Sequence, residues 1–155
     1  MATLLLVRVR EQRLCIIRNK RKIRSYRVST SRFGTGNKEG SQQTPPGLHR
    51  IYRKIGGGLR KGAVLKDRCF TGEYWDGQSQ FGDLILTRIL ALEGLEKGVN
   101  RGGSVDSRKR FIYIHGTNHE KSVGMPASHG CITMKNSDII DLYKRVRKGT
   151  HVLIG

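Results

Sequence analysis

The sequence predicts a mostly β fold with one short helix. Two features of composition favour strands and loops: the 155 residues include twenty glycines but only three prolines, and the apolar residues form short runs. Such runs, separated by glycine-rich and polar stretches, are typical of a sheet with many loops rather than of a helical bundle. The third feature is a single stretch with helical spacing near residues 137–148. A chain of this length suits one domain, and we expect residues 1–155 to form it.

The first third of the chain predicts a β-meander that leads into a long loop. Thr3–Val9 and Gln12–Arg18 combine apolar and charged residues in the manner of strands. Residues 19–22 indicate a turn before a third strand at Ile23–Ser29. Residues 31–44 are rich in Ser, Gly, Thr, Asn and Gln, a composition typical of loops. We therefore expect three neighbouring strands before residue 30.

Four further strands are expected downstream. Leu48–Ile55 alternates apolar and polar residues, whereas Leu84–Leu92 is mostly apolar and indicates a buried strand. Phe111–Ile114 is a short apolar run that ends at a histidine, and His151–Ile154 closes the chain. Residues 63–82 show no clear periodicity and are interpreted as irregular.

The predicted helix begins near Ser137, a residue type that caps helix N-termini. Asp138 and Asp141 would interact favourably with the helix dipole in the first turns, and Gly149 is expected to end the helix. The apolar stripe of this helix consists of Ile139, Ile140, Leu142, Tyr143 and Val146.

The chain is strongly basic. Thirty Lys and Arg against twelve Asp and Glu give a formal charge of +18, and ten of the basic residues lie between Arg8 and Arg32. This charge favours anionic partners such as nucleic acid, acidic lipid or a polyanionic cell envelope. However, solvated strand faces explain the early cluster, and aromatic residues make up only 6 % of the chain, too few for a stacking nucleic-acid site. We therefore expect no nucleic-acid partner.

Cysteine usage and hydropathy limit other classes of site. Three cysteines permit at most one disulfide, between Cys15 and Cys69 if Cys131 stays free, although Cys15 also fits a buried apolar position. No Cys-x-x-Cys pair is present, and we expect no metal site. No segment approaches the roughly 18 apolar residues of a membrane span. Leu4–Val7 is too short for a signal-peptide core and is followed by Arg8, so no export signal is visible.

The most informative stretch is Ser128–Asp138, Ser-His-Gly-Cys-Ile-Thr-Met-Lys-Asn-Ser-Asp. It places His129 two residues before Cys131, and in an extended segment these side chains would lie on one face and meet. A thiol is a strong nucleophile only as thiolate, which a neighbouring imidazole usually generates. Gly130 gives the backbone freedom and lets a substrate approach closely. With His115 at the end of an apolar run, the pattern predicts a cysteine acyl-transfer site.

These residues resemble a known family. Tyr113–Asn118, Ser128–Cys131 and the helix start at Asn136-Ser-Asp resemble the YkuD-type L,D-transpeptidase catalytic domain. Three upstream segments are similar in spacing: Val28-Ser-Thr, Thr44-Pro-Pro-Gly and Asn100-Arg-Gly-Gly. The resemblance therefore covers nearly the whole chain. It implies a β-sandwich-like fold of two mixed sheets with little helix, and no metal or organic cofactor.

The resemblance also implies chemistry in the cell envelope or periplasm. In that family a cysteine attacks the carbonyl of the L-centre of a diamino acid in a peptidoglycan tetrapeptide stem, and the terminal D-alanine leaves. An amine on a neighbouring stem then accepts the acyl group and forms a cross-link. Relatives instead attach an envelope lipoprotein through a lysine, or use water and trim the stem as L,D-carboxypeptidases.

Five positions carry the implied reaction. Cys131 is the expected nucleophile, and His129 and His115 are expected to share the acid and base work, with the identity of the base left open. Backbone N–H groups of Gly130 and Cys131 are the expected oxyanion donors, with Gly116 as a further candidate.

Ser128 and Thr133 are expected at the substrate, and Thr133 departs from the family pattern. Members commonly carry arginine at this position, and a threonine keeps a hydroxyl but loses the charged fork of donors. A non-catalytic wall-binding domain is therefore kept as an alternative to transpeptidase and carboxypeptidase. The remaining histidines are interpreted as structural, at His49 and His151, or as a loop residue, at His119.

Overall fold

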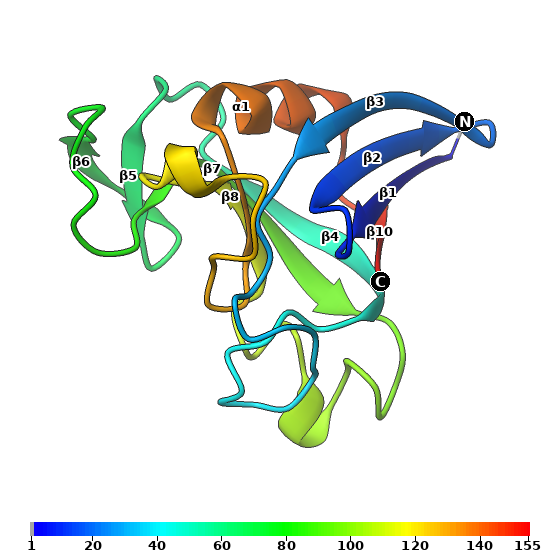
Figure 1. The fold of residues 1–155 in the computed structure, drawn as a ribbon. Coiled ribbons are helices and arrows are strands. Elements are labelled where there is room, and N and C mark those ends of the chain that lie inside the picture. Colours follow the sequence, from blue (N-terminus) through cyan, green and yellow to red (C-terminus); the bar gives the residue numbers. More distant parts are fainter. Residues whose placement is uncertain (1) are drawn as a thin grey trace.

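The computed structural model describes residues 2–155. Its strands are β1 (Thr3–Arg8), β2 (Arg13–Arg18), β3 (Arg21–Arg27), β4 (Gly47–Ile55), β5 (Ala63–Lys66), β6 (Cys69–Tyr74), β7 (Ile85–Gly94), β8 (Tyr113–Gly116), β9 (Ile132–Met134) and β10 (His151–Ile154). One α-helix, α1 (Asn136–Arg145), lies across one face of the sheet, and two short 3₁₀ turns occupy Gly103–Val105 and Glu120–Ser122 within the described residues (Figure 1). The prediction of a mostly β fold with one helix is confirmed.

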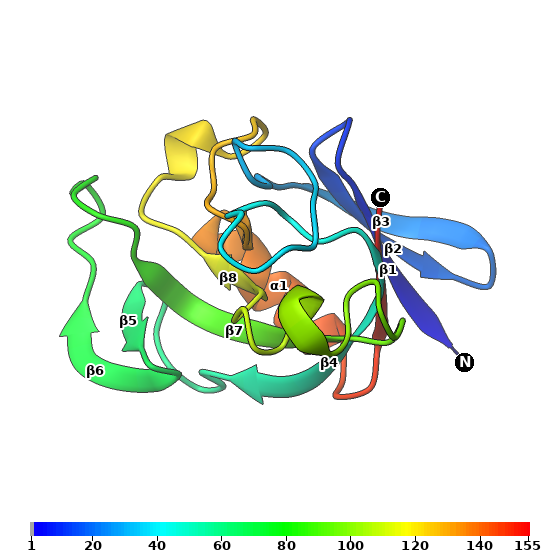
Figure 2. The same ribbon diagram turned by 90° about the horizontal axis from the view of Figure 1, so that it is seen from below.

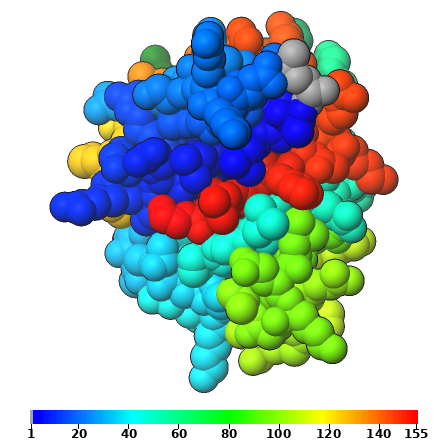
Figure 3. Space-filling view, turned by 90° about the vertical axis from the view of Figure 1, so that its right-hand side faces the viewer, coloured from blue at the N-terminus to red at the C-terminus, as the bar shows by residue number. Residues whose placement is uncertain are grey.

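The strands form one branched sheet. Their order is β3-β2-β1-β10-β4-β7-β5-β6, and β8 joins β7 to β9 (Figure 2). Only the β1–β10 and β8–β9 pairs are parallel, so the sheet is mixed. The parallel pair places the last strand beside the first, and Figure 3 shows them adjacent at the surface, red beside blue. The resemblance implies two sheets, whereas hydrogen bonds here connect all ten strands.

Strand β7 explains the branching, because it pairs with three strands. It pairs with β4 over most of its length, and with β5 and β8 through different segments. The register with β8 shifts between Leu86 and Ile89, where Thr87 has a φ of 78°. The Thr87 hydroxyl compensates for this irregular backbone, since it accepts the Gly62 N–H at 3.0 Å and donates to Asn136 Oδ1 at 2.7 Å. A bulge of this kind bends a strand and lets it serve two neighbours.

The expectation that residues 63–82 are irregular is wrong for its first half, where β5 and β6 form a hairpin. Asp67 and Arg68 make the turn, with φ values of 50° and 63°. Two consecutive residues with positive φ are typical of a two-residue hairpin turn. Every residue of β6 is exposed, so burial imposes no alternation of apolar residues on it. This strand therefore leaves no periodic signal in the sequence.

The core lies on both faces of β7. Leu90 and Leu92 belong to the main cluster, which also receives Ile139 of α1, whereas Ile89 and Ala91 belong to a smaller second cluster. A strand buried on both faces reads as a continuous apolar run, which explains why this segment was predicted correctly. The partly buried Cys131 packs against the second cluster.

The helix begins and ends earlier than the sequence predicts. Its N-cap is Lys135 rather than Ser137, and the last helical residue is Arg145. The Asn136 N–H is bound by the Glu120 carboxylate at 2.8 Å, so a distant acid replaces the expected local cap. At the other end, Lys54 Nζ donates to the carbonyls of Tyr143 at 2.7 Å and Val146 at 2.8 Å. Lys54 thus provides donors for carbonyl groups at the helix C-terminus, before Gly149 is reached.

The three cysteines are free thiols. Cys15 is buried in β2 and Cys69 is exposed in β6, so the two do not form the disulfide considered from sequence. Across residues 2–155, every helix falls short of the length and apolar character needed to cross a membrane.

Candidate active site

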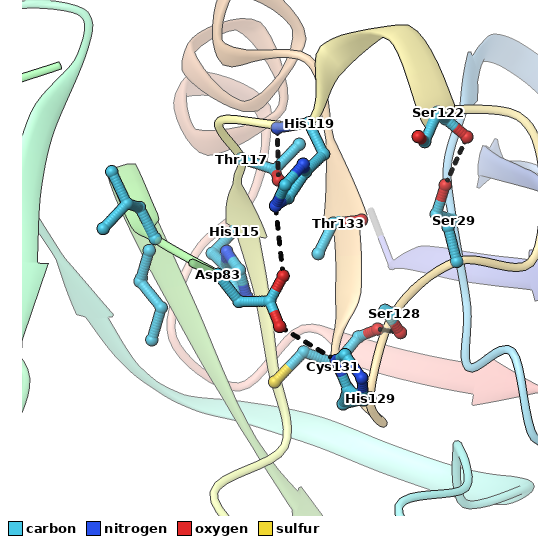
Figure 4. Close-up of a pocket in the computed structure, with 13 residues that line it drawn as sticks. Ser29, Asp83, His115, Thr117, His119, Ser122, Ser128, His129, Cys131 and Thr133 are labelled. Carbon is cyan, nitrogen blue, oxygen red and sulfur yellow. Dashed lines mark hydrogen bonds and ion pairs between the residues drawn. The ribbon is translucent and has the colours of Figure 1, made fainter. Parts of the chain in front are cut away.

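A cavity of about 200 Å³ contains most of the residues predicted for the site. Cys131, His129, His115, Ser128 and Thr133 all line it (Figure 4). The two predicted glycines are not among the lining residues, but each adjoins one of them in the chain. The structure thus brings together side chains from β8, β9 and the loop between them.

The thiol of Cys131 is held against the strand segment that precedes His115. Its sulfur accepts the Tyr113 N–H at 3.4 Å and lies 3.4 Å from the Phe111 carbonyl oxygen, to which the thiol donates. Burial raises the pKa of this thiol to about 11, while the Tyr113 N–H and the charge of Arg110 act in the opposite direction. A pKa this high favours the protonated thiol at neutral pH.

His115 is placed to be a neutral imidazole. It lies inside β8 rather than after it, because Phe111 has a φ of 57° and the strand begins only at Tyr113. The ring is buried, and its Nδ1 lies 2.6 Å from the Gly116 carbonyl oxygen. A carbonyl only accepts, so this contact places the ring proton on Nδ1 and leaves a lone pair on Nε2. Burial lowers the pKa of His115, which the Gly116 carbonyl and Asp83 oppose.

Within the described residues, His129 and Cys131 line the same cavity but form no hydrogen bond with each other. Gly130 between them has a φ of 128°, so the chain turns there and β9 starts only at Ile132. His129 instead points its Nδ1 to the carboxylate of Asp83, 3.0 Å away. The prediction that Gly130 adopts a conformation unfavourable to other residues is confirmed, but the extended geometry assumed for residues 129–131 is wrong.

Ser128 and Gly130 belong to a tightly bonded turn. The Ser128 hydroxyl donates to the Cys131 carbonyl at 2.6 Å and accepts the Gly130 N–H at 3.3 Å. Thr44 from the loop of residues 31–44 donates to the Gly130 carbonyl at 2.9 Å. Figure 2 shows this loop beside the segment that leads to Cys131. Loop and turn together fix the backbone on both sides of the thiol.

The comparison with known families agrees with this geometry. The sequence model of the YkuD family, described as the L,D-transpeptidase catalytic domain, matches residues 2–154. The chain belongs to this family. The resemblance inferred from the His115 and Ser128–Cys131 segments is thereby confirmed.

Individual relatives of the L,D-transpeptidase family match over shorter segments. YqjB of Bacillus subtilis strain 168, named as an L,D-transpeptidase, is 49 % identical over 45 residues, which cover 29 % of this chain and 26 % of that protein. YbiS of Escherichia coli K12, which carries a similar name, is 44 % identical over 43 residues, which cover 28 % of this chain and 14 % of that protein. The matched segments thus span less than a third of these relatives.

Solved L,D-transpeptidase structures share the fold. A mutant enzyme from Enterococcus faecium superimposes with a TM-score of 0.61 at 16 % identity and covers 100 % of this chain and 50 % of that chain. An enzyme from Mycobacterium smegmatis gives a TM-score of 0.57 at 17 % identity and covers 99 % and 58 %. This chain therefore spans half of the first protein and little more than half of the second.

The cavity of this L,D-transpeptidase family member contains Thr133 at the position where an arginine is expected from the family pattern. The side chain of Thr133 is partly buried, and the backbone of this residue is bound to Ser29 in both directions, at 2.8 and 2.9 Å. Among the described residues that line the cavity, no Lys or Arg occurs.

Two cavity residues were not recognised from the sequence as parts of the site. The Asp83 carboxylate bridges two imidazoles, at 3.0 Å from His129 Nδ1 and 3.2 Å from His119 Nε2. His119 was interpreted as a loop residue, and it does lie in a loop, but its ring faces the cavity and also contacts the Gly82 carbonyl at 2.7 Å. Asp83 lies far from the cysteine motif in the sequence, and no local pattern marks either residue. No three His, Cys, Asp or Glu side chains of residues 2–155 are arranged to hold a metal ion.

Arg110 is a third residue that sequence reasoning missed. It lies close enough to Cys131 for its charge to lower the pKa of the thiol. Its guanidinium donates to the carbonyls of Gly36, Asn37 and Gln43, at 3.3, 3.3 and 2.6 Å. Arg110 thus secures the loop over the motif and contributes positive potential at the sulfur.

Proposed function

We propose that this chain is a cysteine L,D-transpeptidase catalytic domain acting on peptidoglycan tetrapeptide stems in the cell envelope. The observation that carries the proposal is the presence of Cys131, His115 and His129 around one cavity in a chain of this family. We further propose that residues 1–155 act as a single domain, and that the acyl acceptor is an amine, either of a second stem or of a lipoprotein lysine.

In the proposed first step, the sulfur of Cys131 bonds to the carbonyl carbon at the L-centre of the diamino acid. The proton of the thiol passes to an imidazole, and backbone N–H groups near Cys131 and Gly116 stabilise the oxyanion. The carbon–nitrogen bond to D-alanine then breaks, and the imidazolium returns the proton to the leaving amine. In the second step an acceptor amine attacks the thioester carbonyl carbon and loses a proton to the imidazole. The carbon–sulfur bond then breaks, and the imidazolium returns the proton to the leaving thiolate.

We assign the base to His115. Its Nδ1 proton is committed to the Gly116 carbonyl, so Nε2 is the nitrogen with a free lone pair. Its lowered pKa keeps it neutral, which a base must be before it accepts a proton. His129 is tied to Asp83 at the cavity, where it is available to the leaving amine or to the substrate. A resting pair of neutral thiol and neutral imidazole becomes charged only during attack.

The test is a reaction of the protein with a disaccharide-tetrapeptide that contains diaminopimelate. Mass spectrometry of protein and products should detect an acyl-enzyme that lacks D-alanine and a cross-linked dimer. Both should disappear in Cys131→Ala and persist in Cys69→Ala, a matched control that removes an exposed thiol.

Other outcomes lead to different assignments. A tripeptide without dimer indicates water as acceptor and an L,D-carboxypeptidase. A folded protein that retains wall affinity but forms no adduct indicates the non-catalytic alternative, which the uncharged Thr133 motivated. In that case Thr133→Arg should restore acylation if the missing charge is the cause.

A further inference from the structure

A second hollow, of about 820 Å³, lies beside the active-site cavity. Five cationic side chains line this basic groove: Arg53, Arg68, Arg108, Lys109 and Lys148. They come from β4, from the β5–β6 turn, from the loop before β8 and from the segment after α1. Tyr52 and Phe111 provide aromatic surface between them. The volume of the groove and its five separate cations suit a ligand with several charged groups better than a single small ion.

Two arginines of the groove are held in place by aromatic rings. The guanidinium carbon of Arg68 lies 5.4 Å from the centre of the Phe111 ring, and its Nη1 donates to the Tyr113 hydroxyl at 3.2 Å. That of Arg108 lies 4.1 Å from the centre of the Tyr52 ring. A ring contact covers one face of a guanidinium and leaves N–H groups at its edge free for a carboxylate. The two donors are therefore preorganised.

Within the described residues, protein carboxylates form an ion pair with one of the five cations of the groove. Arg108 is 3.4 Å from Glu93, but in residues 2–155 no carboxylate lies within ion-pair distance of the other four cations. Asp106 lines the groove, yet its carboxylate accepts the backbone N–H groups of Gly102 at 2.8 Å and Lys109 at 3.0 Å. An anionic ligand would therefore meet side chains whose charge is still available.

The chain segment that lines the groove also contacts the thiol of Cys131. Phe111 lines the groove, and its carbonyl oxygen is the one that the Cys131 thiol contacts. Tyr113 binds Arg68 through its hydroxyl and Cys131 through its N–H. No Lys or Arg is among the described residues that line the cavity around Cys131. A substrate that extends from Cys131 past Phe111 would therefore meet permanent cations in the groove.

We propose that the basic groove binds carboxylate groups of the peptide substrate while a carbonyl of that substrate reacts at Cys131. This inference rests on the proposed function, because it assumes that the ligand at Cys131 is a stem peptide. The edge donors of Arg68 and Arg108 bind one carboxylate each, and the remaining cations add attraction along the groove.

The experiment measures binding to Cys131→Ala protein, which cannot turn over, by isothermal titration calorimetry. The ligands are a diaminopimelate-containing tetrapeptide with free carboxylates and the same peptide with its carboxylates amidated. In this background, Arg68→Gln and Arg108→Gln should each lower the affinity for the peptide with free carboxylates about tenfold. The affinity for the amidated peptide should stay unchanged. Arg53→Gln provides a further variant, since its side chain makes no bond that its loss would break. Arg21→Gln, an exposed cation of β3, is the matched charge control and should have no effect.

The proposal would be overturned if the groove variants and Arg21→Gln bound the peptide with free carboxylates with equal affinity. So would an affinity for single-stranded DNA that depends on Arg68 while peptide affinity does not, because the groove would then be a nucleic-acid site. The proposed function is tested separately, by acylation of the unmodified protein. Acylation with groove-independent peptide binding would refute the groove alone, whereas groove-dependent binding without acylation would refute the transpeptidase assignment.

Discussion

The Cys131 sulfur accepts the backbone N–H of Tyr113 at 3.4 Å, so the candidate nucleophile is anchored to the strand that carries the candidate base. Tyr113 and His115 are two residues apart in β8, and β9 follows Cys131 in parallel beside it. The relative position of thiol and imidazole is thus set by this hydrogen bond and the parallel β8–β9 pair, together with the turn of Ser128–Gly130.

Alkylation of Cys131 should reveal a protonated resting thiol. With the pKa of the thiol raised to about 11, about one molecule in ten thousand carries thiolate at pH 7. The rate of iodoacetamide modification should therefore rise about tenfold per pH unit from neutral pH upwards. Peptide mass spectrometry separates Cys131 from the exposed Cys69, which is an internal reference. A plateau already reached below pH 8 would instead indicate a thiolate–imidazolium pair.

Removal of the Asp83 carboxylate should slow acylation modestly. Asp83→Asn removes the carboxylate that contacts His129 and His119, and these contacts hold the segment before β7 against the motif. The Asp83 carboxylate is largely exposed, so we expect only a two- to fivefold decrease, roughly the effect of two solvent-screened pairs. The measurement is the acylation rate by mass spectrometry, with Glu73→Gln on exposed β6 as control. An unchanged rate would mean that Asp83 does not position His129.

Gly116→Ala should destabilise the fold. An added Cβ would clash with the Leu86 carbonyl oxygen and with the Asn136 side chain, and both are fixed by β7 and the start of α1. We expect a loss of about 1–3 kcal/mol, typical of overpacking a rigid site, in the urea unfolding free energy. Gly155→Ala, where the added Cβ meets open space, is the control. Equal stability of the two variants would show that β8 can shift away from β7.

Stability should fall as the pH drops below about 6.5, because burial lowers the pKa values of His49 and His115. The unfolded chain then binds protons that the folded chain excludes, so the stability present above the unfolded pKa is lost on acidification. Each histidine contributes a slope of up to about 1.4 kcal/mol per pH unit.

Urea unfolding at a series of pH values measures this slope. His49→Gln should reduce this slope by up to about 1.4 kcal/mol per pH unit relative to the unmodified chain. A slope that is the same in the variant and in the unmodified chain would contradict the role of His49.

Most strands could be predicted because burial leaves a local pattern. Burial is partial in Thr3–Arg8 and nearly complete in Ile85–Gly94. In both segments apolar residues occupy most of the buried positions, so the sequence shows where the strands lie. The hairpin of β5 and β6 was missed because it buries little, and the helix start was misplaced because its first N–H is bound by Glu120, sixteen residues away. Hydrogen bonds from distant residues replace local signals and so cannot be recognised in a single sequence.

The sequence by itself determined the family, the candidate nucleophile and the two motif histidines, because their chemistry depends on residue type and short spacing. Only the tertiary structure decided that His129 turns to Asp83, that His115 is bound to the Gly116 carbonyl, and that cations gather at Arg68 and Arg108 beside the thiol. The first and the third of these relationships join segments separated by tens of residues, and the second depends on the backbone conformation of β8. They depend on strand register and on the bends at Thr87 and Gly130, since backbone geometry decides which side chains share a cavity.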